Sequence, residues 1–200
     1  LYNTYAFFVL YANVDKFEYK EADIPLAERP EIDRWIISRL NSLVKEVDAE
    51  YNNYEATNAA RKIMTFVDDH LSNWYVRLCR RRFWKGEYTK DKISAYQTLY
   101  KCLDVVAKLS APIAPFYMDR LFLDLNAASC KDQTCSVHLT DFPVSDRAMI
   151  DRDLEERMNL AQRISSMVLG LRRKVNIKVR QPLAKIMVPV LDEKTERQIK

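Results

Sequence analysis

Glycine is nearly missing from this sequence, whose 200 residues contain only two, Gly86 and Gly170. Tight β-hairpins and loops that wrap around phosphate groups depend on glycine, because glycine takes up positive φ angles at little steric cost. The shortage therefore excludes a glycine-rich nucleotide-binding loop and favours long helices.

Histidine is also scarce, which limits the chemistry open to the chain. His70 and His138 are the only two, and neither belongs to a recognisable set of nucleophile, base and acid. His70 follows Asp68 and Asp69, where a solvated or hydrogen-bonded side chain is expected. We predict no catalytic residue.

The four cysteines give little sign of a metal site. Cys130, Cys135 and His138 are spaced C-x4-C-x2-H, but a structural zinc site needs a fourth ligand and usually a tighter cysteine pair. We predict an exposed loop and no metal. Cys79 and Cys102 fall inside helical patterns, where free thiols pack as small apolar groups. Reduced thiols are typical of the cytoplasm, which is the expected location.

No apolar run is long enough to cross a membrane. The first, Tyr5–Ala12, is too short for a spanning helix and has no basic leader before it. We therefore expect no membrane partner. Because residue 1 is Leu and not Met, we also expect both ends to be internal points of a longer chain.

Apolar residues recur with a helical period along most of the chain. This pattern predicts helices over residues 1–14, 30–54, 55–84, 90–110, 115–125 and 151–174. In the third of these, the residues expected to face the core are Ala60, Ile63, Val67, Leu71, Trp74 and Leu78. The fold class is predicted to be all-α, an antiparallel bundle of about five helices over residues 1–175.

The pattern changes after residue 175. Residues 180–183 are expected to be extended and 185–190 to form a strand. Residues 176–200 would then begin a C-terminal junction region. A second short extended piece is expected at residues 136–139.

The net charge of +4 conceals two strongly basic segments. Residues 74–92 contain seven Lys or Arg against two acids, and residues 163–185 contain seven more with no acid. Such clustering favours a polyanionic partner, and the alternative is two solvated helix faces.

The first basic segment interleaves arginines with aromatic residues. With Trp74 and Leu78 facing the core, one exposed flank carries Asn73, Arg77, Arg80, Arg81 and Trp84, and Lys85 follows them. Arg82 falls nearer the buried edge, where a carboxylate partner is expected. Guanidinium groups bind phosphates and an exposed indole stacks on unpaired bases, so this flank favours single-stranded RNA. The alternative is that the arginines pair with acids of neighbouring helices.

The second basic segment contributes Arg172, Arg173, Lys174, Lys178 and Arg180 as RNA-binding candidates. The helix dipole alone would favour the first three at a helix C-terminus. It does not account for Lys178 and Arg180.

Several motifs in this order resemble one family. They are Asp33–Asn41, Leu71–Arg77 with Arg80–Trp84, Ala111–Phe116, Val137–Pro143 and Asn176–Leu183. Together they resemble the anticodon-binding domain of isoleucyl-tRNA synthetases. The proline-flanked Phe116 pattern is shared with the valyl and leucyl enzymes, whereas Asn-Trp-Tyr-Val-Arg and Arg-Arg-Arg-Phe-Trp point to the isoleucine enzyme.

The resemblance implies a piece of a class I ligase that joins isoleucine to its tRNA with ATP and magnesium. The His-Ile-Gly-His and Lys-Met-Ser-Lys-Ser signatures of that family are missing from this chain. The piece alone is therefore expected to bind no cofactor and to be inactive. Any zinc would belong mostly to regions outside this chain. The expected partner is isoleucine tRNA, and the expected state is monomeric.

Two alternatives stay open. One is the same domain from a valine or leucine enzyme. The other is a helical scaffold module whose basic face docks an acidic protein, which would require no exposed aromatic side chain. Salt-sensitive binding to tRNA, but not to acidic polypeptides, would separate the two classes.

Overall fold

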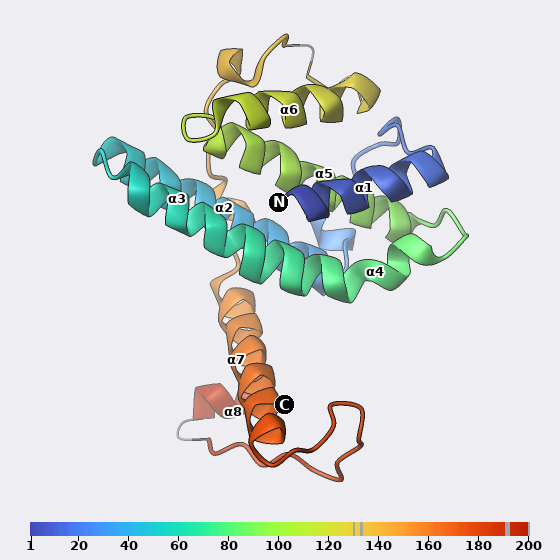
Figure 1. Ribbon diagram of the computed structural model, residues 1–200, viewed down its shortest axis with the longest axis vertical. Coiled ribbons are helices and arrows are strands. Elements are labelled where there is room, and N and C mark those ends of the chain that lie inside the picture. The colour runs from blue at the N-terminus through green and yellow to red at the C-terminus, as the bar shows by residue number, and fades with distance from the viewer. Residues whose placement is uncertain (130, 133, 191–192, 200) are drawn as a thin grey trace. The chain divides into compact units, whose positions relative to one another are not determined.

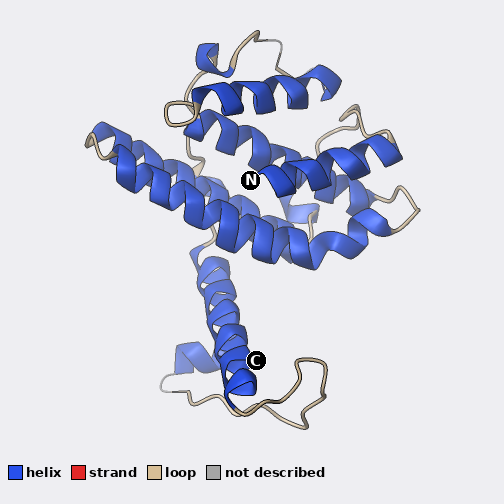
Figure 2. Cartoon of the chain, viewed as in Figure 1, coloured by secondary structure: helices blue, strands red, loops and turns tan. Residues whose placement is uncertain are grey.

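The computed structural model describes every residue except 130, 133, 191–192 and 200. It divides into two compact units, Leu1–Ile150 and Asp151–Lys200. All regular structure in the described residues is helical (Figure 2), so the predicted all-α class is confirmed. The predicted start of a junction region at residue 176 stays a prediction.

The first unit is built around the long helix α5. The helices of this unit are α1 (Tyr2–Asp15), α2 (Glu31–Asn52), α3 (Ala56–Thr65), η2 (Phe66–Val76), α4 (Arg77–Trp84), α5 (Lys90–Ser110) and α6 (Pro115–Ser129). Three short 3₁₀ turns complete it, η1 (Leu26–Glu28), η3 (Val137–Leu139) and η4 (Arg147–Met149). Helix α5 packs against α1, α2, α3, α4 and α6. α3, η2 and α4 run on as one rod beside α2 (Figure 1).

Local signals in the sequence set the helix ends. Pro30 and Pro115 stand at the starts of α2 and α6, where a missing backbone N–H costs nothing. The Thr89 hydroxyl accepts a hydrogen bond from the Lys92 amide at 3.4 Å and caps α5. Helices α2, α5 and α6 thus begin close to where the sequence predicted them.

The middle of the rod is a π-helix, η2, and this corrects the predicted buried stripe. Leu78 is 55% exposed, although it was expected to face the core together with Trp74, which is half-buried. Hydrogen bonds in a π-helix join residues five apart, so a turn holds more residues than the 3.6 of an α-helix. Residues exactly four apart therefore stay on one side. The buried stripe is Ile63, Val67, Leu71, Tyr75, Cys79 and Phe83.

A buried carboxylate joins four helical segments. Asp33 of α2 is fully buried and accepts two hydrogen bonds from the Arg82 guanidinium, at 2.6 and 2.9 Å. It also accepts from the Tyr75 hydroxyl at 2.9 Å and the Ser94 hydroxyl at 2.6 Å. Arg82 reaches on to the Asp91 carboxylate at 3.0 Å. The predicted pairing of Arg82 with a carboxylate is confirmed, and this cluster fixes α2, η2, α4 and α5 together.

A second buried ion pair secures α1. The Lys92 side chain is only 2% exposed, and its ammonium lies 2.5 Å from the Asp15 carboxylate. It also donates to the Lys85 carbonyl at 2.6 Å. The Tyr96 hydroxyl donates to the same Asp15 carboxylate. The end of α1 and the chain after α4 are therefore both held to the start of α5.

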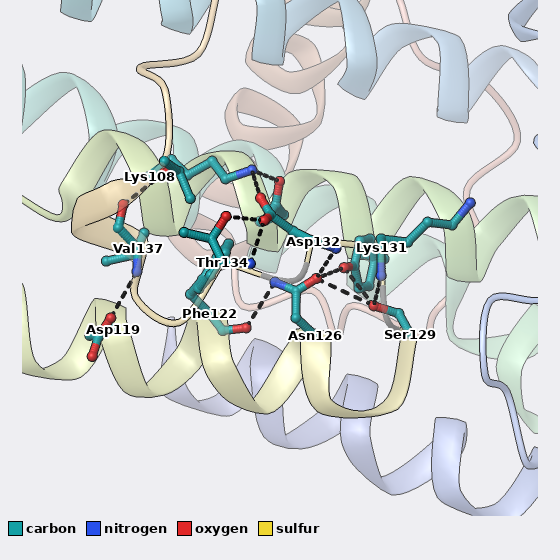
Figure 3. A network of polar contacts seen from close by, with 12 residues as sticks. Lys108, Asp119, Phe122, Asn126, Ser129, Lys131, Asp132, Thr134 and Val137 are labelled. Carbon is teal, nitrogen blue, oxygen red and sulfur yellow. Dashed lines mark hydrogen bonds and ion pairs between the residues drawn. The ribbon is translucent and has the colours of Figure 1, made fainter.

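Hydrogen bonds shape the loop that follows α6 (Figure 3). The Asp119 carboxylate accepts from the Ser136 hydroxyl at 2.7 Å and from the Val137 amide at 2.8 Å. Asp132 accepts from the Thr134 amide at 3.0 Å and lies 3.4 Å from the Lys108 ammonium. The extended piece expected at residues 136–139 is a 3₁₀ turn, η3, because these contacts fold the chain back onto α6.

The second unit contains α7 (Arg152–Lys174) and α8 (Glu193–Ile199). The Asp151 carboxylate accepts from the Leu154 amide at 3.0 Å and caps α7, which follows the predicted helix closely. The strand expected over residues 185–190 is wrong. A strand needs a neighbour to complete its ladder, and no described residue pairs with this segment. Nowhere in the described residues is a helix long and apolar enough to cross a membrane.

Removing the Arg82 guanidinium should show how far the stability of the first unit depends on the Asp33–Arg82 pair. Arg82→Ala leaves a buried charge without its cation, and we expect it to lower the free energy of unfolding by about 3–5 kcal/mol. Arg80→Ala, on an exposed site of the same helix, should change it by no more than about 0.5 kcal/mol. Urea unfolding followed by tryptophan fluorescence reports the first unit, since Trp35, Trp74 and Trp84 all lie there. Equal effects of the two substitutions would contradict the argument.

The stability that Asp119 contributes through its hydrogen bonds to Ser136 and Val137 should depend on pH. Donation from Ser136 and from the Val137 amide lowers the pKa of the Asp119 carboxyl below its usual range. Its contribution to stability is therefore complete above the ordinary carboxyl pKa and is lost as the pH falls through the lower folded value. We expect Asp119→Asn to reduce the urea midpoint at pH 7, with the deficit shrinking below about pH 4. Asp141→Asn, on an exposed site nearby, is the control, and a deficit independent of pH would refute the assignment.

Candidate nucleic-acid interface

Helix α4 presents a basic exposed face. Since each α-helical residue advances by about 100°, Arg77, Arg80, Arg81 and Trp84 fall within an arc of about 100°. All four are exposed. The opposite side of the helix carries Cys79 and Phe83, each 1% exposed. The sequence therefore predicted the exposed flank of α4 correctly, even though it placed Leu78 on the wrong side.

Asn73 and Lys85 extend this face at its two ends. Asn73 lies in η2 four residues before Arg77, and its side chain is exposed. Lys85 follows the last residue of α4, where the backbone turns to an extended conformation. Its carbonyl is held by Lys92 while its side chain is exposed. We call Asn73, Arg77, Arg80, Arg81, Trp84 and Lys85 the α4 face.

The charges of the α4 face are not neutralised from within the first unit. Among the described residues, no hydrogen bond or ion pair joins the side chains of Arg77, Arg80 or Arg81 to another group. Arg82 differs, because Asp33 and Asp91 both contact it. Pairing with neighbouring helices, the alternative weighed from the sequence, therefore applies to Arg82 and not to these three.

The face also carries apolar surface. Trp84 is 57% exposed at the end of α4, and Leu78 is 55% exposed next to Arg77 in the chain. An indole with more than half its surface in water gains by covering one ring face, and a nucleic-acid base provides a flat partner of suitable size. Leu78 was missed from the sequence because only the wider turn of η2 rotates it outward.

The second basic cluster lies in the second unit. Arg173, Lys174, Lys178 and Arg180 are exposed at the end of α7 and just after it. Arg172 is half-buried, and one of its nitrogens donates to the carbonyl oxygens of Lys178 at 2.8 Å and Gln181 at 2.9 Å. Arg172 therefore shapes the chain after α7, which leaves Arg173, Lys174, Lys178 and Arg180 as the side chains facing water.

The described histidine and cysteine residues considered for catalysis and metal binding lie in environments that favour neither role. The His70 ring packs against Trp35, with 5.9 Å between ring centroids. Burial raises the pKa of the Cys79 thiol to about 11 and raises that of Cys102 further. Cys135 is exposed, and Cys130 lies outside the described residues. Across the part of the chain that is described, no three His, Cys, Asp or Glu side chains cluster as a metal site would require.

Comparison with known proteins agrees with these features. A model of the anticodon-binding domain of tRNA ligases matches residues 33–188. The isoleucine–tRNA ligase of Bacteroides thetaiotaomicron is 66% identical over 199 residues, covering 100% of this chain and 17% of the relative. That of Cytophaga hutchinsonii is 61% identical over 199 residues, covering 100% and 18%. That of Dehalococcoides mccartyi strain CBDB1 is 50% identical over 197 residues, covering 98% and 19%.

The chain thus spans less than one fifth of the length of these relatives. The resemblance seen in its motifs is confirmed by a match that extends over most of its residues. One family accounts for the basic, aromatic and helical features, each of which was ambiguous by itself. The chain belongs to the family of anticodon-binding domains of tRNA ligases.

Proposed function

We propose that this chain binds the anticodon stem-loop of isoleucine tRNA as part of an isoleucine–tRNA ligase. The observation that carries the proposal is the α4 face, where Arg77, Arg80 and Arg81 are exposed without partners beside an exposed Trp84. Arginines of this kind bind phosphates, and an exposed indole stacks on an unpaired base. The names of the relatives support isoleucine over valine or leucine.

The residues divide by what they would read. Arg77, Arg80, Arg81 and Lys85 would contact phosphates, which position an RNA but carry little sequence information. Trp84 and Asn73 would lie against unpaired bases, and the Asn73 amide both donates and accepts hydrogen bonds. Arg173, Lys174, Lys178 and Arg180 of the second unit would add phosphate contacts, with Arg172 holding their loop.

The remaining steps belong to the rest of the enzyme. Activation of isoleucine with ATP and magnesium would take place outside this chain, to which no catalytic residue is assigned. The enzyme would work in the cytoplasm, where aminoacylated tRNA is used. An acidic protein partner is the less favoured candidate, because it would leave the exposed Trp84 unexplained.

Replacing one arginine of the α4 face should weaken RNA binding without changing its specificity. We expect Arg81→Ala to reduce affinity for different anticodon stem-loops by a similar factor. It should also flatten the slope of log K against log salt by about 0.7–0.9, as for one lost phosphate contact. Arg120→Ala on α6, where the side chain is 77% exposed, is the control. Fluorescence anisotropy at several salt concentrations measures both values. An unchanged slope in all of Arg77→Ala, Arg80→Ala and Arg81→Ala would remove the α4 face as the binding surface.

Replacing Trp84 should affect base stacking instead. Trp84→Leu keeps an apolar side chain but removes the aromatic ring, and we expect a loss of about 1–3 kcal/mol in binding to the isoleucine stem-loop. The salt slope should stay that of the parent, because no charge is lost. Phe116→Leu, the same kind of change at a ring that is 91% exposed on α6, is the matched control. If Trp84→Leu folds like the parent and binds equally well, Trp84 does not stack on a base.

A further inference from the structure

A cavity of about 410 Å³ lies in the first unit, between α2 and the chain segment over residues 142–147. Its lining includes Lys45 and Asp48 from α2, and Phe142, Ser145 and Arg147 from the segment. Neither side was singled out as a binding site from the sequence. Nearly one hundred residues separate Lys45 from Phe142, so only the fold brings them together.

Hydrogen bonds to Asn41 fix the far wall of the cavity. The Ser145 hydroxyl donates to the Asn41 carbonyl at 2.8 Å, and the Asp146 amide donates to the Asn41 side-chain oxygen at 3.0 Å. Lys45 lies one helical turn after Asn41, and Asp48 follows on the same side of α2. The cavity is therefore formed before any ligand binds.

Two cations and one acid face this space. Lys45 and Arg147 are exposed, and no described residue forms a hydrogen bond or ion pair with either side chain. Asp48 is the acid of the lining. Two unpaired cations at one cavity favour an anionic ligand. The Asp48 carboxylate favours a ligand that also carries a hydroxyl donor. A ligand with negative charge over its whole surface would be repelled by this carboxylate.

An aromatic ring completes the lining. Phe142 is 38% exposed, and its other side packs against Tyr51 in a T-shaped arrangement with 6.0 Å between centroids. The Tyr51 hydroxyl donates to the Leu109 carbonyl at 2.9 Å, which holds that ring in place. Phe142 thus offers a fixed ring next to the two cations.

We propose that this cavity binds one ribonucleotide unit of the tRNA as a second contact separate from the α4 face. Lys45 and Arg147 bind the phosphate, Phe142 packs against the base or the sugar, and the Asp48 carboxylate accepts a hydrogen bond from the ribose 2′-hydroxyl. Lys45 lies twelve residues beyond Asp33, about 18 Å along α2, and Asp33 marks the Arg82 end of the rod. The two sites therefore contact different nucleotides. This inference rests on the proposed function.

Charge-removing and ring-removing variants test the phosphate and the stacking contact. The probe is an isoleucine anticodon stem-loop RNA, titrated against the whole chain. We expect Lys45→Ala with Arg147→Ala to flatten the salt slope by about 0.7, as for one single-stranded phosphate. We expect Phe142→Leu to weaken binding by about 5- to 150-fold at an unchanged slope. Arg120→Ala is the control for charge, and a urea midpoint equal to that of the parent shows that each variant is folded.

The Asp48 contact requires a different comparison. A DNA hairpin of the same sequence lacks the 2′-hydroxyl, so the parent should bind the RNA more tightly than the DNA. Asp48→Ala should bring the ratio of the two affinities toward one. If Asp48 merely repels the backbone, its removal would strengthen both hairpins equally and leave the ratio as it was, which would refute this contact.

The results separate this proposal from the function on which it rests. Loss of affinity in Arg81→Ala together with unchanged binding in the Lys45, Arg147 and Phe142 variants would overturn the cavity alone. A parent chain that binds no stem-loop at all would overturn both. Flattened slopes that add when the Arg81 and the Lys45–Arg147 substitutions are combined would support two separate phosphate contacts.

Discussion

A charged carboxylate inside a protein has to be neutralised and hydrogen-bonded, and the first unit is arranged so that this happens at Asp33. Its oxygens receive donors from Arg82, Tyr75 and Ser94, which come from three other segments of the chain. If any of these segments slid or rotated, the Asp33 charge would lose a hydrogen-bond partner inside the apolar core. Arg82 is therefore unavailable to an RNA, and the same restraint holds its neighbours on the outer side of α4.

The division of labour within the run Arg80–Arg82 follows from helix geometry. Adjacent arginines point in directions about 100° apart, so one turns toward Asp33 while two face water. A count of basic residues in this segment overstates the charge that a ligand would meet, because Arg82 binds the buried Asp33 carboxylate and Lys92, itself buried, binds the Asp15 carboxylate. The electrostatic character of the α4 face thus depends on Arg77, Arg80, Arg81 and Lys85.

Apolar periodicity in the sequence was sufficient to predict the helices from α1 to α7, but not α8. The angle of Arg82 relative to its neighbours predicted its buried partner. Periodicity failed at Leu78 because it assumes 3.6 residues per turn, and η2 has more. It failed at residues 185–190 because β propensity says nothing about whether a neighbouring strand is present. The exposure of the α4 face was predicted, whereas its role stays a prediction. The cavity beside Lys45 was beyond reach, since it depends on contacts between distant segments.

The π-helix has a consequence for how this region can change over generations. Substitutions within η2 leave the number of residues between α3 and α4 unaltered, so Phe83 and Cys79 stay inside. Loss or gain of a single residue would instead turn α4 by about 100° relative to α3, carrying the arginines of the exposed side toward the core and Phe83 toward water. We therefore expect Phe66–Val76 to keep the same length among related chains.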